Sequence, residues 1–237
     1  MTQSQQPVAI ITGAGSGIGR AASIQLASHG YRVILVGRRL DSLNQTGEIL
    51  SNTKAHWHAM DADISISQDR KKIVDEALTQ YGRVDALVNN AAIGTCKPIG
   101  ELSETEIRDL YEINAIGPTD LVRRLLPELT KTSGCVVNIA SVAMIDPFEG
   151  LGIYGCTKAA IDSLTRAIHT EYHKQGVRAY TIAPGAVETD MLRSIVSAEM
   201  LPTEHTLSTE TIASEITSCI MESGSHVSGS TIVLSSQ

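Results

Sequence analysis

Short apolar segments alternate with longer amphipathic segments along nearly the whole chain. The apolar segments are rich in Val, Ile, Leu and Ala and end in turn residues, which is typical of buried strands. The predicted strands are Val8–Thr12, Arg32–Val36, Ala55–Met60, Val84–Val88, Cys135–Ile139, Val177–Ile182 and Thr231–Leu234. The predicted helices are Ile18–His29, Leu40–Leu50, Gln68–Tyr81, two within Glu104–Leu129 that meet or kink near Pro118, Gly155–Gln175 and Thr209–Met221.

This alternation predicts repeated βαβ units, which build a parallel sheet. Right-handed crossovers place the connecting helices on both faces of such a sheet. We therefore expect an α/β fold, a doubly wound parallel sheet between two helical layers, in a single domain over residues 1–237. The longest stretch without clear periodicity, Glu188–Leu207, is predicted to be a substrate lid loop.

The composition fits this architecture and excludes some partners. Hydrophobic residues make up 42% of the 237 residues but aromatic residues only 3%, so Ala, Val, Ile and Leu must form the core. The net charge is −7 and no long Lys/Arg run exists, which argues against a nucleic-acid partner. No apolar run approaches the ~20 residues of a membrane span, so no membrane partner is expected.

The N-terminus and the cysteines indicate a cytoplasmic protein. Met1–Pro7 is polar and uncharged, unlike a secretory signal. Cys96, Cys135, Cys156 and Cys219 are scattered without a C-x-x-C pair, so free thiols in a reducing compartment are expected.

A glycine-rich turn joins the first predicted strand to the first predicted helix. Its sequence is Thr12-Gly13-Ala14-Gly15-Ser16-Gly17-Ile18-Gly19. Glycines allow a tight turn and let a pyrophosphate approach the backbone, while the helix offers free N–H groups and the positive end of its dipole. We therefore predict dinucleotide binding, with a plain tight turn as the alternative. The predicted contacts are Gly13, Gly15, Ser16, Gly17, Ile18 and Gly19.

Two arginines follow the second predicted strand, where a dinucleotide site often has a carboxylate for the ribose 2′-hydroxyl. The strand ends Val36-Gly37-Arg38-Arg39. Guanidinium groups suit a 2′-phosphate. Arg38 and Arg39 therefore predict a preference for NADP over NAD, and two solvated arginines in a turn are the alternative.

Candidate reacting groups lie near the start of the helix predicted from Gly155. Tyr154 and Lys158 are spaced i, i+4 and so lie on one helix face. A nearby ammonium favours the phenolate and is expected to lower the pKa of Tyr154 from about 10. Such a tyrosine can exchange a proton with an alcohol or a carbonyl oxygen. Ser141, just after a strand end, can donate a hydrogen bond to the same oxygen.

Together these motifs resemble the short-chain dehydrogenase/reductase family, in its short single-domain branch with a Tyr-x-x-x-Lys active site. The resemblance runs from about Pro7 to Leu234. Further matching motifs are Asp63-Ile64-Ser65, Asn89-Asn90-Ala91-Ala92, Asn114 and Pro184-Gly185. The resemblance implies a three-layer Rossmann fold and hydride transfer between NADP(H) and a carbonyl or alcohol.

The resemblance also implies a role for each matching residue. Tyr154 is the expected acid/base, and Lys158 tunes it and holds the nicotinamide ribose. Ser141 orients the substrate carbonyl, and Asn114 supports a proton relay through water to Lys158. The remaining cofactor contacts are Asp63 and Ile64 at the adenine, Asn90 and Ala91 near the ribose, and Pro184, Gly185, Val187 and Thr189 at the nicotinamide.

The substrate is predicted from the segments expected to wall the pocket. These are Val142–Ile153, Ile93–Lys97 and the lid from Met191, and they are largely apolar. We predict reduction of a small to medium hydrophobic ketone, aldehyde or dicarbonyl. A 3-oxoacyl thioester reductase and a non-catalytic NADP-sensing protein are the alternatives.

The resemblance implies a homodimer or homotetramer, because relatives usually associate through two long helices. The corresponding segments are Glu104–Leu129 and Gly155–Gln175. No metal is predicted, because His169 and His173 stand i, i+4 without an evident third ligand.

Overall fold

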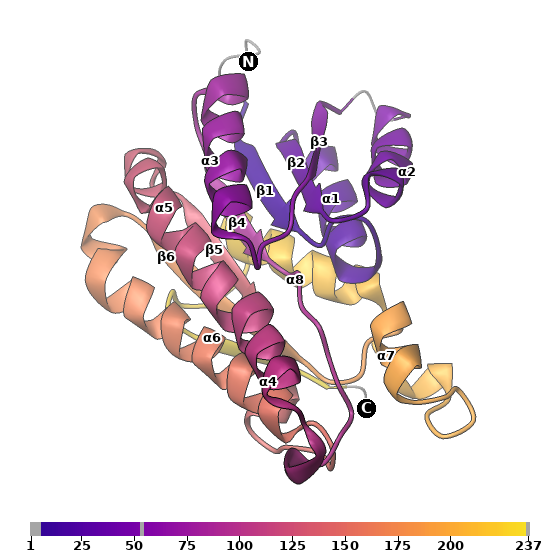
Figure 1. The fold of residues 1–237 in the computed structure, drawn as a ribbon. Helices are drawn as coiled ribbons and strands as arrows, with labels where there is room; N and C mark the ends of the chain where they lie inside the picture. The colour runs from indigo at the N-terminus through magenta and orange to yellow at the C-terminus, as the bar shows by residue number, and fades with distance from the viewer. Residues whose placement is uncertain (1–5, 53–54, 236–237) are drawn as a thin grey trace.

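Seven parallel strands form one sheet in the order β3-β2-β1-β4-β5-β6-β7 (Figure 1). The fold is that of a computed structural model, which describes residues 6–52 and 55–235. The strands are β1 Val8–Thr12, β2 Arg32–Gly37, β3 Trp57–Asp61, β4 Ala86–Asn89, β5 Cys135–Ile139, β6 Arg178–Pro184 and β7 Thr231–Leu234. This order confirms the predicted doubly wound sheet and Rossmann fold.

Helices cover both faces of the sheet and complete the three layers (Figure 1). They are α1 Gly17–Ser28, α2 Leu40–Ser51, α3 Ser67–Tyr81, α4 Glu104–Tyr111, α5 Gly117–Thr132, α6 Gly152–Tyr172, α7 Asp190–Ile195 and α8 Thr209–Met221. Side chains alternate between the faces of a strand, so each face has its own apolar core. Ile11 packs with the layer of α1, α2 and α8, whereas Ile10 packs with the layer of α3, α5 and α6.

The segment predicted to hold two long helices is divided by a π-helical turn. This turn, Glu112–Ile116, separates α4 from α5. Pro118 is the second residue of α5, directly after the π-helical turn, so its missing N–H interrupts the helical hydrogen bonds where the chain passes from the π-helical turn into α5. The predicted junction near Pro118 is therefore observed.

Part of the predicted lid is helical. Residues 188–207 contain α7 and a 3₁₀ turn, Thr203–His205, where only a loop was predicted. The Thr189 hydroxyl caps α7 by accepting the N–H of Leu192 at 3.2 Å. A helix of six residues is too short for an amphipathic period, so the sequence pattern could not indicate it.

The topology directs ligands to one edge of the sheet. The chain first builds β1 to β3 in one direction and then β4 to β7 in the other, so the strand order reverses between β1 and β4. In open α/β sheets, ligands bind at the carboxyl ends of the strands beside such a reversal. Within the described part of the chain, no helix is both long and apolar enough to cross a bilayer.

Candidate active site

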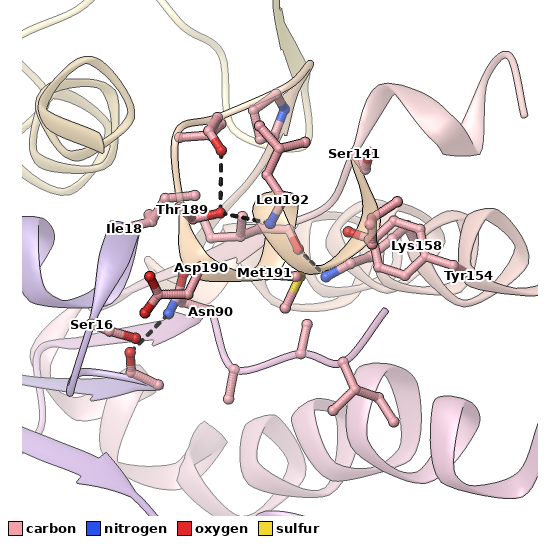
Figure 2. Close-up of a pocket in the computed structure, with 18 of the residues that line it drawn as sticks. Ser16, Ile18, Asn90, Ser141, Tyr154, Lys158, Thr189, Asp190, Met191 and Leu192 are labelled. Atoms are coloured by element: carbon pink, nitrogen blue, oxygen red, sulfur yellow. Dashed lines mark hydrogen bonds between the residues drawn. The ribbon is translucent and has the colours of Figure 1, made fainter. Parts of the chain in front are cut away.

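A cavity of about 1030 Å³ lies at the carboxyl ends of the strands. It brings together the glycine-rich turn, the arginines after β2 and the proposed reacting groups. Figure 2 shows Ser16 and Ile18 on one side of it and Ser141, Tyr154 and Lys158 on the other. The predicted site residues that line it are Gly13, Gly15, Ser16, Ile18, Arg38, Arg39, Asp63, Ile64, Asn90, Ala91, Ser141, Tyr154, Lys158, Pro184, Gly185, Val187 and Thr189.

Two of the predicted glycines, Gly17 and Gly19, do not line the cavity but allow close packing beside it. A Cβ on Gly19 would lie 2.2 Å from the carbonyl oxygen of Gly13, so α1 approaches the turn as closely as backbones can. Gly17 has a φ of +50°, and a Cβ there would lie 3.1 Å from Cγ2 of Thr189. Both positions therefore need glycine for the shape of the turn.

The glycine-rich turn is held by side chains that the sequence analysis did not single out. The Thr12 hydroxyl accepts the backbone N–H groups of Asn90 and Ala91, each at 3.0 Å. The Thr46 hydroxyl donates to the carbonyl of Ala14 at 3.0 Å. Arg20 donates both to Gly15 and to Thr46. Asn90, Ala91 and Thr46 lie on segments distant in the sequence, so local patterns gave no signal for their bonds to the turn.

The edge of the cavity after β2 is positively charged. Arg38 and Arg39 are exposed there, and Nη1 of Arg38 lies 4.0 Å from Oδ2 of Asp63. Ser42, in the first turn of α2, lines the same edge and was missed in the sequence. A phosphate at this edge would therefore meet two guanidinium groups, a hydroxyl and the start of a helix.

The proposed reacting groups meet where β5 and α6 approach each other. Ser141 follows β5 and caps a 3₁₀ turn by accepting the N–H of Ala143 at 3.2 Å. Lys158 is buried and donates through Nζ to the carbonyl of Ile139 at 2.8 Å. Its Nζ lies 5.5 Å from the centre of the Tyr154 ring. Ser141 lies close enough to Tyr154 for a side-chain hydrogen bond to act on the pKa of the tyrosine.

Burial sets the protonation of this group. It raises the pKa of Tyr154 to about 12, and the hydrogen bond with Ser141 offsets only part of that rise. Burial also lowers the pKa of Lys158 to about 8. The predicted lowering of the Tyr154 pKa is therefore wrong for this structure, because desolvation of the phenolate is the largest influence on that pKa. Tyr154 is a neutral proton donor at neutral pH.

Asn114 lies behind the cavity, in the π-helical turn, and its side chain does not line the cavity. Its Oδ1 accepts the N–H of Ile93 at 2.8 Å, and its Nδ2 donates to the carbonyl of Ile93 at 2.9 Å. The Nδ2 also donates to the hydroxyl of Thr157 at 3.1 Å. The side chain thus ties the loop after β4 to α6, while a role in a proton relay stays a prediction.

The remaining wall of the cavity is apolar and comes mainly from the lid. Figure 2 shows Met191 and Leu192 between Ser16 of the glycine-rich turn and the cluster of Ser141, Tyr154 and Lys158. The other apolar side chains of this end include Ile93, Phe148, Ile195, Val196 and Met200. Phe148 and Met200 are strongly exposed, so they form part of the rim.

Comparison with known sequences gives one family. Residues 7–200 match the family described as short chain dehydrogenase. A 7alpha-hydroxysteroid dehydrogenase of Escherichia coli is 33% identical over 193 residues, which are 81% of this chain and 75% of that protein. An uncharacterized oxidoreductase of Listeria monocytogenes is 33% identical over 195 residues, 81% of this chain and 79% of that one.

Solved structures agree with the sequence match. A 7α-hydroxysteroid dehydrogenase complexed with NADH and 7-oxo glycochenodeoxycholic acid superposes with a TM-score of 0.91 at 29% identity, over 97% of this chain and 93% of that one. A 3-ketoacyl-(acyl-carrier-protein) reductase from Brucella melitensis, complexed with NADH, superposes with a TM-score of 0.88 at 27% identity, over 96% of both chains. The chain therefore belongs to the short-chain dehydrogenase/reductase family and is an oxidoreductase that acts on CH–OH groups.

Proposed function

We propose that this protein is an NADP(H)-dependent carbonyl reductase for small to medium hydrophobic ketones, aldehydes or dicarbonyls. One observation carries the proposal. The cavity has a glycine cradle at one end, and Ser141, Tyr154 and Lys158 line the other. The cradle fits a dinucleotide, since Gly13 and Gly15 leave the backbone open to its phosphates.

The residues divide the proton chemistry between them. Tyr154, held neutral by burial, donates its proton to the substrate oxygen as negative charge develops there. Ser141 donates a second hydrogen bond to that oxygen and so orients the carbonyl. Lys158 holds the nicotinamide ribose and stabilises the phenolate that remains on Tyr154. The bound nicotinamide cofactor supplies the hydride.

The cofactor choice rests on the edge after β2. Arg38, Arg39 and Ser42 supply donors for a 2′-phosphate, and β2 ends without a carboxylate that would repel it. Related structures have been solved with NADH and with NADP bound. Because relatives of both kinds exist, we base the choice of NADP(H) on Arg38 and Arg39 of this chain.

The substrate class rests on the apolar lid and rim. Met191, Leu192 and Ile195 offer the reacting carbonyl an apolar surround. Glu149 lines the cavity and Asp146 is exposed three residues before it, so a strongly anionic substrate is disfavoured. A neutral hydrophobic carbonyl fits this wall better than an acyl-carrier thioester.

NADPH oxidation tests the proposal with a panel of aldehydes, ketones, dicarbonyls and a 3-oxoacyl thioester. Wild-type protein should turn over a neutral member with NADPH faster than with NADH. Tyr154→Phe should abolish turnover and still bind NADPH, and Arg38→Ala should weaken NADPH binding selectively. Equal binding of NADH and NADPH, unaffected by Arg38→Ala, would contradict the cofactor choice. Tight NADPH binding without turnover of any panel member would favour a cofactor-sensing role.

We further propose that the protein works in the cytoplasm as a homodimer or homotetramer. Its four cysteines are free thiols, which suits a reducing compartment. The exposed sides of α5 and α6 are available for association through the helices that relatives use. Sedimentation equilibrium that shows a stable monomer would contradict the assembly.

A further inference from the structure

Helix α6, which carries Tyr154 and Lys158, packs on the sheet through buried polar side chains as well as apolar ones such as Ile161 and Ile168. The strands beneath it contribute one row of residues at matching register across β4, β5, β6 and β7. We call this row and its helix partners the polar seam. Its members are Asn89, Asn138, Thr181 and Thr231 from the strands and Asp162 and Thr165 from α6.

Four of the six residues, Asn89, Asn138, Thr165 and Thr181, form a continuous chain of side-chain hydrogen bonds. Nδ2 of Asn89 donates to Oδ1 of Asn138 at 2.8 Å, and Nδ2 of Asn138 donates to the hydroxyl of Thr165 at 2.8 Å. The hydroxyl of Thr181 also donates to that of Thr165, again at 2.8 Å. The side chains of Asn138, Thr165 and Thr181 are fully buried. Thr231 and Asp162 form a separate pair beside this chain, in which the Thr231 hydroxyl donates to Asp162.

The helices on the opposite face of the sheet pack on it differently from α6. There α1 and α8 pack on the strands through apolar side chains such as Leu26, Ile212 and Ile216. Apolar contact is non-directional and tolerates a small slide of a helix. Hydrogen bonds between buried groups weaken steeply when their distances or angles change, so the polar seam accepts one position of α6.

That position bears directly on the reacting groups. Thr165 follows Lys158 by seven residues, about two helical turns, and so lies on the same face of α6. Asn138 precedes Ile139, whose carbonyl accepts the Lys158 ammonium at 2.8 Å. Ser141 follows Asn138 by three residues. The polar seam therefore fixes the two elements that bring Ser141, Tyr154 and Lys158 together.

We propose that the polar seam is a positioning device for catalysis, with Asn138, Thr165 and Thr181 as its positioning residues. It sets the axial position of α6 on β5 and thereby the place of Tyr154 and Lys158 relative to Ser141. The proposal rests on the carbonyl reduction proposed above. A displacement of about 1 Å at a reacting group can reduce a rate by roughly a hundredfold.

Thr181→Val is the central test, because it removes one donor and keeps the shape of the side chain. Thr165 then still accepts from Asn138 and donates to the carbonyl of Ile161. We expect kcat with NADPH to fall roughly tenfold, with KM for the carbonyl substrate nearly unchanged. Thr181→Ser, which restores the hydroxyl, should recover most of the lost kcat.

The matched control is Thr217→Val on α8. Thr217 is also a buried threonine, but its hydroxyl bonds Gln25 at 3.4 Å on the opposite face of the sheet. This variant should keep the wild-type kcat. Thermal unfolding of all three variants separates a loss of folded protein from a loss of rate. Thr165→Val, which also leaves Nδ2 of Asn138 without its acceptor, should reduce kcat further than Thr181→Val.

A second readout does not depend on any substrate. Displacing α6 changes the bond from Lys158 to Ile139, so the pH dependence of NADPH binding should shift in Thr181→Val and return in Thr181→Ser. If wild-type protein reduces no carbonyl, the proposed function fails and this readout still tests the polar seam. The proposal is overturned if Thr181→Val has the same kcat as Thr217→Val and also binds NADPH with the same pH dependence as the wild-type protein. It is also overturned if Thr181→Ser recovers nothing.

Discussion

The two ends of the cavity are built on different principles. The cofactor end depends on close backbone contact, as at Gly19 beside Gly13, and on hydrogen bonds from Thr12, Arg20 and Thr46. The substrate end depends on flexible apolar side chains of the lid and rim, several of them exposed. Backbone contacts fix one shape, whereas Met and Leu side chains can repack around different ligands.

This contrast teaches where specificity resides. The cofactor end should lose function sharply when its geometry changes, because backbone atoms cannot move aside. The substrate end should respond gradually, because its residues contribute area more than defined bonds. Substitutions at the two ends therefore test whether the cavity is rigid at one end and adaptable at the other.

Gly19→Ala should have the largest effect. Its Cβ would lie 2.2 Å from the Gly13 carbonyl oxygen and 2.6 Å from Nδ2 of Asn90, so the glycine-rich turn must shift. Overpacking costs about 1–3 kcal/mol, which corresponds to a factor of roughly 5 to 150 in binding. We expect the upper part of that range for the Kd of NADPH, measured by fluorescence titration.

Gly100→Ala is the control for this change. A Cβ there would meet no atom within 4 Å, so NADPH binding should match the wild type. If Gly19→Ala bound NADPH as the wild type does, the cofactor end would be adaptable and the contrast would fail.

The Lys158 ammonium should give the next largest effect, as a pH dependence. Burial lowers its pKa to about 8, so the lysine is charged below pH 8 and neutral above it. Its proposed bond to the nicotinamide ribose then weakens, and kcat/KM for NADPH should fall by up to about tenfold per pH unit above pH 8. This quantity reports ionisations of the free enzyme.

Lys158→Arg checks the assignment of that pH dependence. Arginine stays charged throughout this range, so the decline near pH 8 should disappear even though the overall rate is lower. An unchanged decline in Lys158→Arg would mean that another group titrates there.

At the substrate end, Arg193→Met should loosen the lid and have a several-fold effect. Arg193, in α7, pairs with Glu188 and donates to the carbonyl of Leu201 at 2.8 Å. Its hydrogen bond to Glu188 also lowers the pKa of that carboxyl group. We expect KM for the carbonyl substrate to rise several-fold, with the Kd of NADPH within about twofold of wild type.

Arg108→Met provides the comparison for an ion pair away from the cavity. It breaks the exposed i, i+4 pair between Arg108 and Glu104 on α4, which should leave KM unchanged. Steady-state kinetics at low and high salt complete the test, since salt should mimic Arg193→Met in the wild type. If Arg193→Met weakened NADPH binding more than substrate binding, the lid would belong to the cofactor end.

The sequence showed the parts of this site that depend on local spacing. The glycine-rich turn could be predicted because its glycines lie between a strand and a helix. Tyr154 and Lys158 could be paired because their i, i+4 interval places them on one helix face. The order of elements likewise indicated the doubly wound sheet. These features are encoded within about one βα unit each.

The rest depends on contacts between distant segments. The Thr12 hydroxyl accepts hydrogen bonds from the backbone of Asn90 and Ala91, which are 78 and 79 residues away in the sequence. Asn138 donates a hydrogen bond to Thr165, which lies on another element. The sign of the Tyr154 pKa shift required its burial, which a spacing rule does not contain. The short helix α7 was not predicted, because its six residues complete too few turns to show an amphipathic pattern.

The smallest expected effect belongs to Met200→Ser at the tip of the lid. Met200 is 81% exposed, so little of its surface is buried unless a ligand covers it. A bulky hydrophobic ketone should reach it and show a KM raised by up to about threefold, which is about 0.7 kcal/mol. A small ketone should show no change. Met221→Ser on α8, which lies outside the cavity wall, should affect neither substrate. Equal effects of Met200→Ser on both ketones would mean that the lid acts as a rigid element, like the cofactor end, because an adaptable wall contributes only the area that each ligand covers.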